Sequence, residues 1–227
     1  MKRIAIFVFL LCIVFLPALA QEENEQLRVN VKGFMDTYHA LRTEVPNDWM
    51  ASCSRVRGEL SLEKGNAGMF VSANAVYNSL LKSQSGFFLR EAYLYYGKSN
   101  WDIRAGRQII IWGVADAMRI TDIVSPMDFT EFLTQDYDDI RIPVNCVRFK
   151  YTHPKWNAEA VIIPVSSFYE LSTDRNNPWA LTLPGVSMPY SINIDNTPEK
   201  RFRSVEYGGR FGAYLSGGDF SAVSYTH

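Results

Sequence analysis

Residues 55–63 read RVRGELSLE, and polar and apolar side chains alternate strictly along this stretch. Charged or hydroxyl residues occupy the odd positions, whereas valine, glycine and leucine occupy the even ones. Because successive side chains of an extended strand point to opposite faces, this period of two predicts a β-strand with one polar and one apolar face. The sequence Lys64-Gly65-Asn66 follows directly and is typical of a tight turn that closes a hairpin.

The same alternation recurs along the chain and predicts nine strands. They cover residues 28–40, 55–63, 69–77, 87–96, 101–110, 145–152, 157–163, 203–215 and 220–227. Short turns follow the second, fourth, sixth and eighth strands, whereas longer links follow the first, third, fifth and seventh. Strands that run up and down between short turns at one end and long loops at the other are the layout of an outer-membrane β-barrel. We therefore expect an all-β fold, an antiparallel up-and-down transmembrane β-barrel with its short turns in the periplasm.

The odd number of strands implies a larger barrel. Bacterial single-chain barrels have an even strand count, and an unclosed barrel has two bare edges that lipid does not tolerate. We therefore expect residues 21–227 to form the N-terminal portion of a longer barrel domain. The alternative is that the pattern miscounts the strands by one.

The first twenty residues predict export. Lys2 and Arg3 precede an apolar run over residues 4–16, and Ala18-Leu19-Ala20 gives the small-x-small pattern of a signal-peptide cleavage site. The run is too short to span a membrane comfortably. We expect a signal peptide over residues 1–20, location in the outer membrane of a Gram-negative cell, and outer-membrane lipid and the barrel-assembly machinery as partners.

Composition narrows the functional classes. The formal net charge of −1 gives no reason to expect a nucleic-acid partner. Aromatic residues make up 14% of the chain, which suits either a β-sandwich or the aromatic girdle of a membrane barrel. A disulfide between Cys53 and Cys146 is an open but disfavoured alternative, because two cysteines cannot define a disulfide-stapled fold.

A distinctive segment interrupts the strand pattern between residues 106 and 143. It contains Gly106-Arg107-Gln108, Trp112-Gly113, Asp122 and Pro126-x-Asp128. In these motifs the chain resembles a largely uncharacterised family of Gram-negative outer-membrane barrels related to alginate-export-type porins. The resemblance implies a barrel and the passage of small or hydrophobic organic solutes.

The physical chemistry of the same segment predicts a structured loop. Ser125-Pro126-Met127-Asp128 has the cap, first-position proline and first-turn acid of a helix start, so we expect a short helix to about Leu133. The segment is too long for a plain surface loop and is expected to fold into or over the pore mouth. Its acidic residues are expected to pair with Arg119 and Arg141, either to hold the loop in shape or to form a constriction.

Binding of calcium by Asp136, Asp138 and Asp139 is the less favoured alternative, because the spaced oxygen ligands and glycine of an EF-hand loop are missing. We expect no metal site and no cofactor.

The polar strand faces and the interrupting segment supply the candidate lumen and constriction residues. These are Arg55, Arg57, Glu59, Arg104, Gln108, Trp112, Asp116, Arg119, Asp122, Asp128, Asp136, Asp138, Asp139, Arg141, Arg148 and Arg210. Acidic and basic residues balance along the polar faces, so no strong ion selectivity is expected. Because Arg90 and Glu91 are adjacent, the alternation allows only one of them to face inward.

The sequence favours a channel over an enzyme. It contains no G-x-S-x-G, H-E-x-x-H or P-loop motif, and its three histidines are scattered. We expect a porin-like channel or transporter component for passive passage of small organic solutes. The alternatives are a secreted or surface all-β module that binds glycans or protein ligands, using Trp49, Trp101, Trp156 and Trp179 for glycans, and an outer-membrane barrel with an enzymatic or purely structural role.

Overall fold

The protein forms a single antiparallel β-sheet. The computed structural model describes residues 26–112, 123–131, 134, 139–172, 177–180, 205–216 and 218–226. The strands are β1 (Arg28–Leu41), β2 (Trp49–Lys64), β3 (Ala67–Asn78), β4 (Gly86–Lys98), β5 (Trp101–Gln108), β6 (Val144–His153), β7 (Trp156–Ile163), β8 (Glu206–Leu215) and β9 (Gly218–Thr226), and a 3-10 turn η1 (Lys82–Gln84) lies between β3 and β4. No helix among the described residues is long and apolar enough to cross a membrane.

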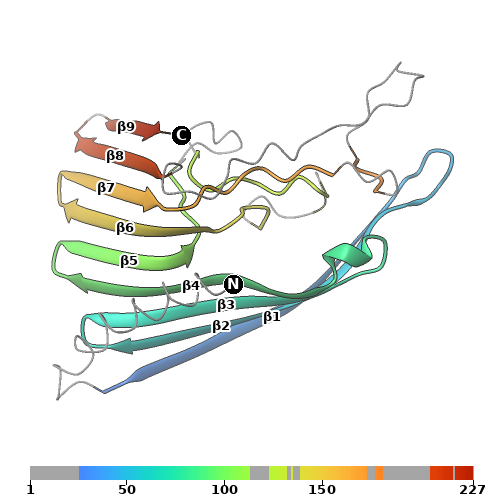
Figure 1. Cartoon of the computed structure of the whole chain (residues 1–227), viewed down its shortest axis with the longest axis horizontal. Coiled ribbons are helices and arrows are strands. Elements are labelled where there is room, and N and C mark those ends of the chain that lie inside the picture. Colours follow the sequence, from blue (N-terminus) through green and yellow to red (C-terminus); the bar gives the residue numbers. More distant parts are fainter. Residues whose placement is uncertain are drawn as a thin grey trace.

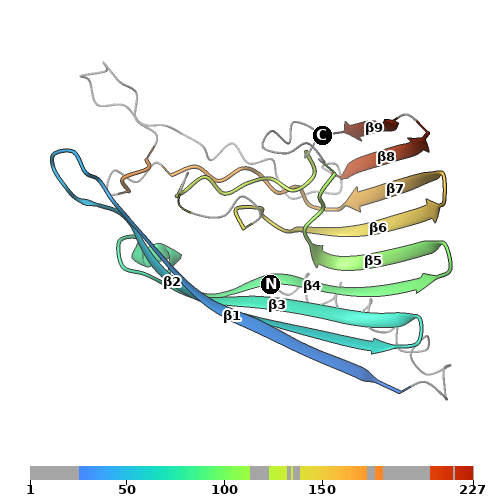
Figure 2. The same cartoon turned by 180° about the vertical axis from the view of Figure 1, so that it is seen from behind.

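Strand order follows the sequence from β1 to β9, and every neighbouring pair is antiparallel (Figure 1, Figure 2). The predicted all-β, up-and-down arrangement of strands is therefore confirmed. The short turns lie together at one end of the sheet, and the long links leave from the opposite end (Figure 1). Within the described part of the chain, β1 and β9 each have one neighbour, so the sheet is open.

The first link is shorter than the alternation predicts. β2 begins at Trp49 rather than at residue 55, because residues 49–54 pair with the end of β1 although they lack a clear polar–apolar alternation. The remaining link is a compact turn in which the backbone N–H of Arg42 donates to the carbonyl of Asp48 over 2.9 Å. Asn47 takes a left-handed conformation with φ of 57°, which asparagine tolerates better than most residues.

The helix expected after Ser125 is wrong over residues 125–131. Met127 and Asp128 instead form isolated β-bridges with Arg141 and Glu170. The N–H of Asp128 donates to the carbonyl of Ile140 over 2.7 Å, so this group is bonded to a distant segment and not within a helical turn. Residues 132–133 lie outside the described residues.

The two faces of the sheet differ sharply in chemistry. Strand register places Val31 beside Leu60 and Lys32 beside Glu59, so the alternation of each strand stays in phase with that of its neighbour. We call the face that carries Val31 the apolar face and the face that carries Lys32 the polar face. On the apolar face, Val31 is 73% exposed and Met35 is 75% exposed.

An aromatic row crosses the apolar face near the short turns. It consists of Tyr96, Trp101, Phe149, Tyr151, Trp156, Phe211 and Phe220. Trp156 joins its neighbours on both sides, because its ring centre lies 5.1 Å from that of Tyr151 and 5.9 Å from that of Phe211. The row therefore continues from strand to strand.

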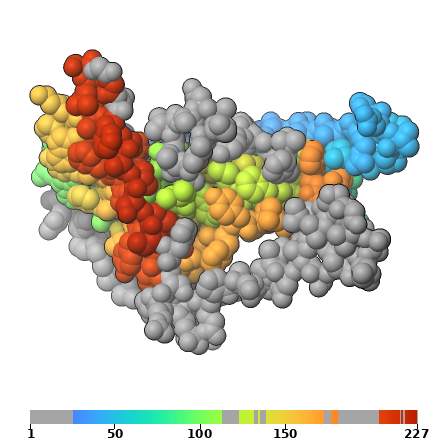
Figure 3. All heavy atoms as spheres, turned by 90° about the horizontal axis from the view of Figure 1, so that it is seen from above, coloured from blue at the N-terminus to red at the C-terminus, as the bar shows by residue number. Residues whose placement is uncertain are grey.

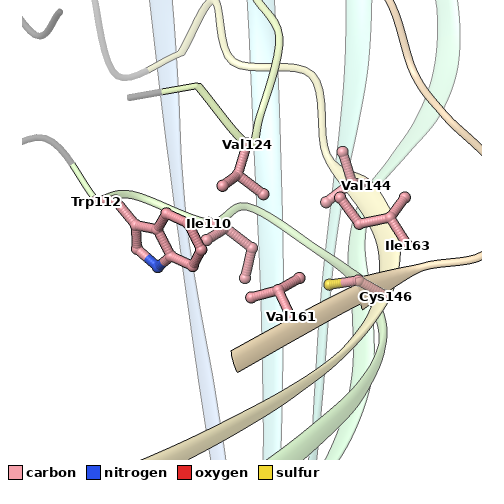
Figure 4. Close-up of a cluster of buried hydrophobic side chains, with 7 residues drawn as sticks. All are labelled: Ile110, Trp112, Val124, Val144, Cys146, Val161 and Ile163. Carbon is pink, nitrogen blue, oxygen red and sulfur yellow. The ribbon is translucent and has the colours of Figure 1, made fainter. Parts of the chain in front are cut away.

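An apolar core lies at the opposite end of the sheet, on the polar face of β6 and β7 (Figure 4). It consists of Ile110, Trp112, Val124, Val144, Cys146, Val161 and Ile163. Three members come from the long link after β5, so the beginning of that link folds against the polar face. Cys146 in this core and Cys53 on β2 are buried free thiols.

Candidate functional site

The described parts of the two long links join to cover the polar face. We call residues 123–131, 134, 139–143, 164–172 and 177–180 the cap. Its two halves are joined where the N–H of Phe129 donates to the carbonyl of Glu170 over 2.8 Å, and the rings of Phe129 and Tyr169 stack 6.0 Å apart. In Figure 3 the cap (yellow-green and orange) lies between β8–β9 (red) and the far end of the β1–β2 hairpin (blue).

Asp139 fixes the cap to the sheet. Its carboxylate lies 2.8 Å from Arg55 Nη2, 2.7 Å from Arg57 Nη2 and 3.4 Å from Arg90 Nη1. Arg55 also binds Asp36 on β1, through Nε at 3.0 Å. We call these five residues the Asp139 cluster. Burial alone would raise the pKa of Asp139, but the hydrogen bond from Arg57 and the charges of the three arginines outweigh burial and hold that pKa below its ordinary value.

Arg55 and Arg57 are also held by an aromatic ring. Their guanidinium carbons lie 5.3 Å and 4.9 Å from the ring centre of Phe34, within the range of a cation–π contact. Both arginines come from the alternating stretch 55–63, whose odd positions point to the polar face. The alternation therefore places the two arginines that bind Asp139 on the polar face.

Glu131 provides a second attachment. The hydroxyl of Tyr38 donates to Glu131 Oε2 over 2.8 Å, and Asn78 Nδ2 donates to Oε1. The side chain of Glu131 is only 5% exposed, so these donors replace the water that its carboxylate loses. The other half of the cap is attached where Trp179 Nε1 donates to the carbonyl of Met50 over 2.8 Å.

A cavity of about 340 Å³ lies between the cap and the far ends of β2, β3 and β4. Asp139 and Glu131 line it, as do Arg90, Arg107 and Arg141. The apolar part of the wall includes Val76 and Phe88. The cavity is therefore a charged space with an apolar side.

Arg107 and two acids form one end of this cavity. Arg107 Nε donates to the carbonyl of Leu89 over 3.2 Å. Burial raises the pKa of Asp128, and the charge of Glu131 raises it further, whereas a hydrogen bond from Thr130 opposes the shift. Burial also raises the pKa of Glu170, as does the neighbouring charge of Asp128.

Gly106, beside Arg107, is constrained by the backbone. Its φ is 137°, and a Cβ at this position would collide with the carbonyl oxygen of Ala92 and with the backbone of Tyr93. Only glycine adopts this conformation without strain. The glycine of the Gly106-Arg107-Gln108 motif thus permits the close pairing of β4 with the end of β5.

A second group of charges lies elsewhere on the polar face. Asp102 contacts Arg148 Nη2 at 2.8 Å and Arg104 Nε at 3.5 Å. Arg210 is separate again, on β8, with Nε 3.4 Å from the hydroxyl of Ser221. Glu59 lies on the polar face of β2, opposite Lys32 on β1.

Trp112 and Gln108 occupy buried positions near the end of β5. Trp112 is 1% exposed, and its Nε1 donates to Glu159 on β7 over 2.6 Å. Gln108 Nε2 contacts the carbonyl of Cys146 at 3.4 Å. These two side chains tie the start of the link after β5 to β6 and β7.

The structure thus unites some of the residues expected from the sequence and separates others. Arg55, Arg57, Asp128, Asp139 and Arg141 meet at or beside the cavity, whereas Arg104, Arg148 and Arg210 lie in other parts of the polar face. Asp139 contacts three arginines of the strands, whereas the sequence suggested Arg119 and Arg141 as partners for the acids of this segment. Other expected members fall outside the described residues: Asp116, Arg119, Asp122, Asp136 and Asp138.

Sequence reasoning missed Arg90, because it allowed only one of Arg90 and Glu91 to face inward. That expectation is wrong. The register of β3 and β4 shifts between Ser72 and Ala73, and this bulge lets Arg90 reach Asp139 while Glu91 accepts a hydrogen bond from the N–H of Ile109 over 2.8 Å. A bulge leaves no clear sequence signal here. Tyr38 follows the polar phase of its predicted strand, whereas Asn78 lies one residue beyond the predicted end of its strand.

Within the ranges that the structure describes, no group of three or more histidine, cysteine, aspartate or glutamate side chains is arranged to hold a metal ion. The site is instead built from arginine–carboxylate pairs, amides and tyrosine hydroxyls. Such groups bind and orient polar molecules.

Residues 79–222 match the model of DUF1302, a family described as a protein of unknown function. The match runs from the link after β3 into β9 and includes the cap, and it covers more than half of the chain. The chain therefore belongs to the DUF1302 family. No curated protein matches it.

Proposed function

We propose that this member of the DUF1302 family forms part of the wall of an outer-membrane β-barrel and acts as a porin-like channel for small organic solutes. The polar face would line the lumen, and the cap would constrict it. This proposal includes the expected relationship to alginate-export-type porins and the outer membrane of a Gram-negative cell as the location.

The main support for this proposal is the way in which apolar and polar side chains are divided between the two faces of the sheet. Apolar side chains on one face are exposed across the nine strands, whereas on the other face charged and amide side chains near the cap, such as Arg57 and Asn78, are buried. Exposed apolar surface costs roughly 25 cal/mol per Å² in water, a cost that contact with lipid removes. A polar interior with an apolar exterior is the pattern of a membrane barrel.

Strand length supports the same arrangement. β5 to β9 contain 8 to 10 residues each, close to the roughly 9–11 residues of a membrane-spanning strand. β1 and β2 are longer, at 14 and 16 residues, and their far ends extend beyond those of β5–β9 (Figure 1). The cap packs against this extension, and in a membrane it would lie at the mouth of the pore.

Local chemistry along β1 supports a membrane boundary. Val29, Val31 and Met35 lie on the apolar face, but the next positions on that face are Thr37 and His39. These two side chains contact each other at 2.9 Å, and both contact serine hydroxyls of β2. The aromatic row near the short turns would mark the opposite boundary, because aromatic residues concentrate at membrane interfaces.

The proposed barrel must also be closed. The sheet edges at β1 and β9 expose backbone groups that lipid cannot satisfy, so a membrane form requires both edges to be paired. We propose that the nine strands belong to a larger closed barrel.

Fractionation and conductance test the function in two steps. The protein is expected in the outer membrane, with heat-modifiable migration in detergent, and the purified full-length protein is expected to conduct ions in planar bilayers. Recovery as a soluble secreted protein would contradict the barrel and favour the all-β binding module instead. Recovery in the outer membrane without conductance would contradict the channel and leave a structural or enzymatic barrel.

A further inference from the structure

We propose that the cavity beneath the cap binds a small organic acid, with its carboxylate at Arg107 and its apolar body against Phe88. The inference names a solute class for the proposed channel and in that sense rests on the proposed function. The cavity volume of about 340 Å³ falls at the lower end of the roughly 300–1,000 Å³ typical of small-molecule sites.

Positive charge converges on the cavity from several elements. The contributing arginines are Arg55 of β2, Arg90 of β4, Arg107 of β5 and Arg141 of the cap. A guanidinium presents paired N–H donors that match the two oxygens of a carboxylate, and the interaction strengthens when water is excluded. Asp139 already pairs with Arg55 and Arg90, so Arg107 is the guanidinium that we assign to the carboxylate of the solute.

Three of the four acids in the wall already have hydrogen-bond or ion-pair partners in the protein. Asp139 is held by three arginines, and Glu131 by Tyr38 and Asn78. Asp128 accepts hydrogen bonds from the backbone N–H and the hydroxyl of Thr130. These carboxylates are therefore poorly placed to bind a cationic ligand.

Arg107 differs from the arginines of the Asp139 cluster. Among the described residues, its one hydrogen bond uses Nε and the carbonyl of Leu89, and it forms no ion pair. Its terminal nitrogens therefore remain for a ligand. Glu170 attracts Arg107, and burial together with the charge of Asp128 raises the pKa of Glu170.

The rest of the wall suits an apolar body. Val76, Phe88, Ile142 and Pro143 line the cavity. Phe88 belongs to the polar face of β4, opposite Asn74, yet it is 42% exposed, so its ring is available to a ligand. A solute with one carboxylate and an aromatic or aliphatic body complements both ends.

Calorimetry on the full-length protein in detergent micelles tests this with three probes of similar shape: phenylacetate, neutral phenylacetamide and cationic 2-phenylethylamine. Phenylacetate is expected to bind at least about tenfold more tightly than phenylacetamide, as the loss of a charged hydrogen bond predicts. Equal affinity for these two, or a preference for 2-phenylethylamine, would overturn the inference.

Variants locate the binding group. Arg107→Gln is expected to reduce phenylacetate affinity to that for phenylacetamide, whereas Arg28→Gln, the same change at the opposite end of the sheet, is expected to leave it unchanged. Arg107→Lys keeps the charge but loses the paired donors, and an intermediate affinity is expected. Unchanged affinity in folded Arg107→Gln would overturn the inference.

If Arg107→Gln does not fold, a second variant at Phe88 tests the same inference. Phe88→Ala removes a partly exposed ring and is expected to weaken phenylacetate binding several-fold while leaving acetate binding unchanged. Unchanged phenylacetate affinity would overturn the inference. Conductance of the same preparation separates the two proposals: a channel that does not bind phenylacetate contradicts only the solute class, whereas binding without conductance contradicts only the channel.

Discussion

The two faces of the sheet carry opposite kinds of side chain at neighbouring residues of one strand. Val31 stands on the apolar face without a protein layer over it, whereas Lys32 lies on the face that further along carries the buried Asp139 cluster and the cap. Soluble sheets bury their apolar face and hydrate their polar one. Under the proposed function, lipid would take the place of a covering protein layer on one side, and the polar face would satisfy its charges internally.

The largest loss of folding stability is expected from Asp139→Asn. The change leaves Arg55, Arg57 and Arg90 together without their shared carboxylate, and loss of one partner from a buried ion cluster costs about 3–5 kcal/mol. Urea unfolding of the protein in detergent, followed by tryptophan fluorescence, measures the loss.

The matched control is Asp48→Asn. Asp48 pairs with Arg42 at 3.1 Å in the first link, where both side chains are more than a third exposed, so its loss should cost less than about 1 kcal/mol. Similar losses in both variants would show that the cap does not bury its charges.

The apolar face is tested by Val31→Arg. An arginine facing lipid near the membrane midplane costs about 2–4 kcal/mol, because its charge loses hydration. Asn30→Arg, one residue earlier on the polar face, should cost much less. Unfolding in lipid vesicles compares the pair, and equal costs would contradict the assignment of faces.

A smaller loss of folding stability is expected from Trp112→Phe. Phenylalanine is smaller than the indole and has no N–H, so Glu159 loses the donor that lies 2.6 Å away, and a loss of about 1–3 kcal/mol is expected. Trp49→Phe, at a half-exposed tryptophan in β2, serves as the control for ring substitution. A loss no larger than that of the control would remove the role assigned to the Trp112–Glu159 bond.

The smallest expected effect is a change in the stability of the cap with pH. The pKa values of Asp128 and Glu170 are raised above the ordinary 3.8 and 4.5, so their stabilising contribution is full below those values and is lost as pH rises through the raised pKa values. The pKa of Asp139 is lowered, so its contribution is present above 3.8 and is lost as pH falls through the lowered pKa. Hydrogen exchange over residues 126–142 should therefore show greatest protection in mildly acidic solution.

Glu170→Gln isolates one part of this dependence. Without its ionisable group, protection should fall less as pH rises from mildly acidic to neutral. A steady rise in protection over that range in the unmodified protein would contradict the assigned pKa directions.

The sequence predicted the strands well because the alternation is local and repeated. Residues 28–40 and 55–63 show it, and their faces follow from it alone. The helix after Ser125 was mispredicted because a favourable local start lost to backbone pairing with Glu170 and Arg141, far along the chain. Tertiary contacts of this kind have no local signature.

The site was only partly predictable for the same reason. Arg55, Arg57 and Asp139 stood out as charged residues, but their meeting depends on how a long link folds back onto β2. Arg90 was missed because a bulge breaks the alternation. Glu131 was hidden within the expected helix, although it forms one of the two attachments on that side of the cap.

The most direct test of the central claim is a scan of β1 with nitroxide spin labels in lipid vesicles. Single cysteines replace Val29 to Asp36 in turn, with Cys12, Cys53 and Cys146 changed to serine. If the apolar face meets lipid, oxygen, which concentrates in lipid, will reach labels at 29, 31 and 35 more readily than a water-soluble nickel reagent does, whereas labels at 30, 32 and 36 will show the reverse. Labels at 29, 31 and 35 that are as open to the nickel reagent as their neighbours would contradict it.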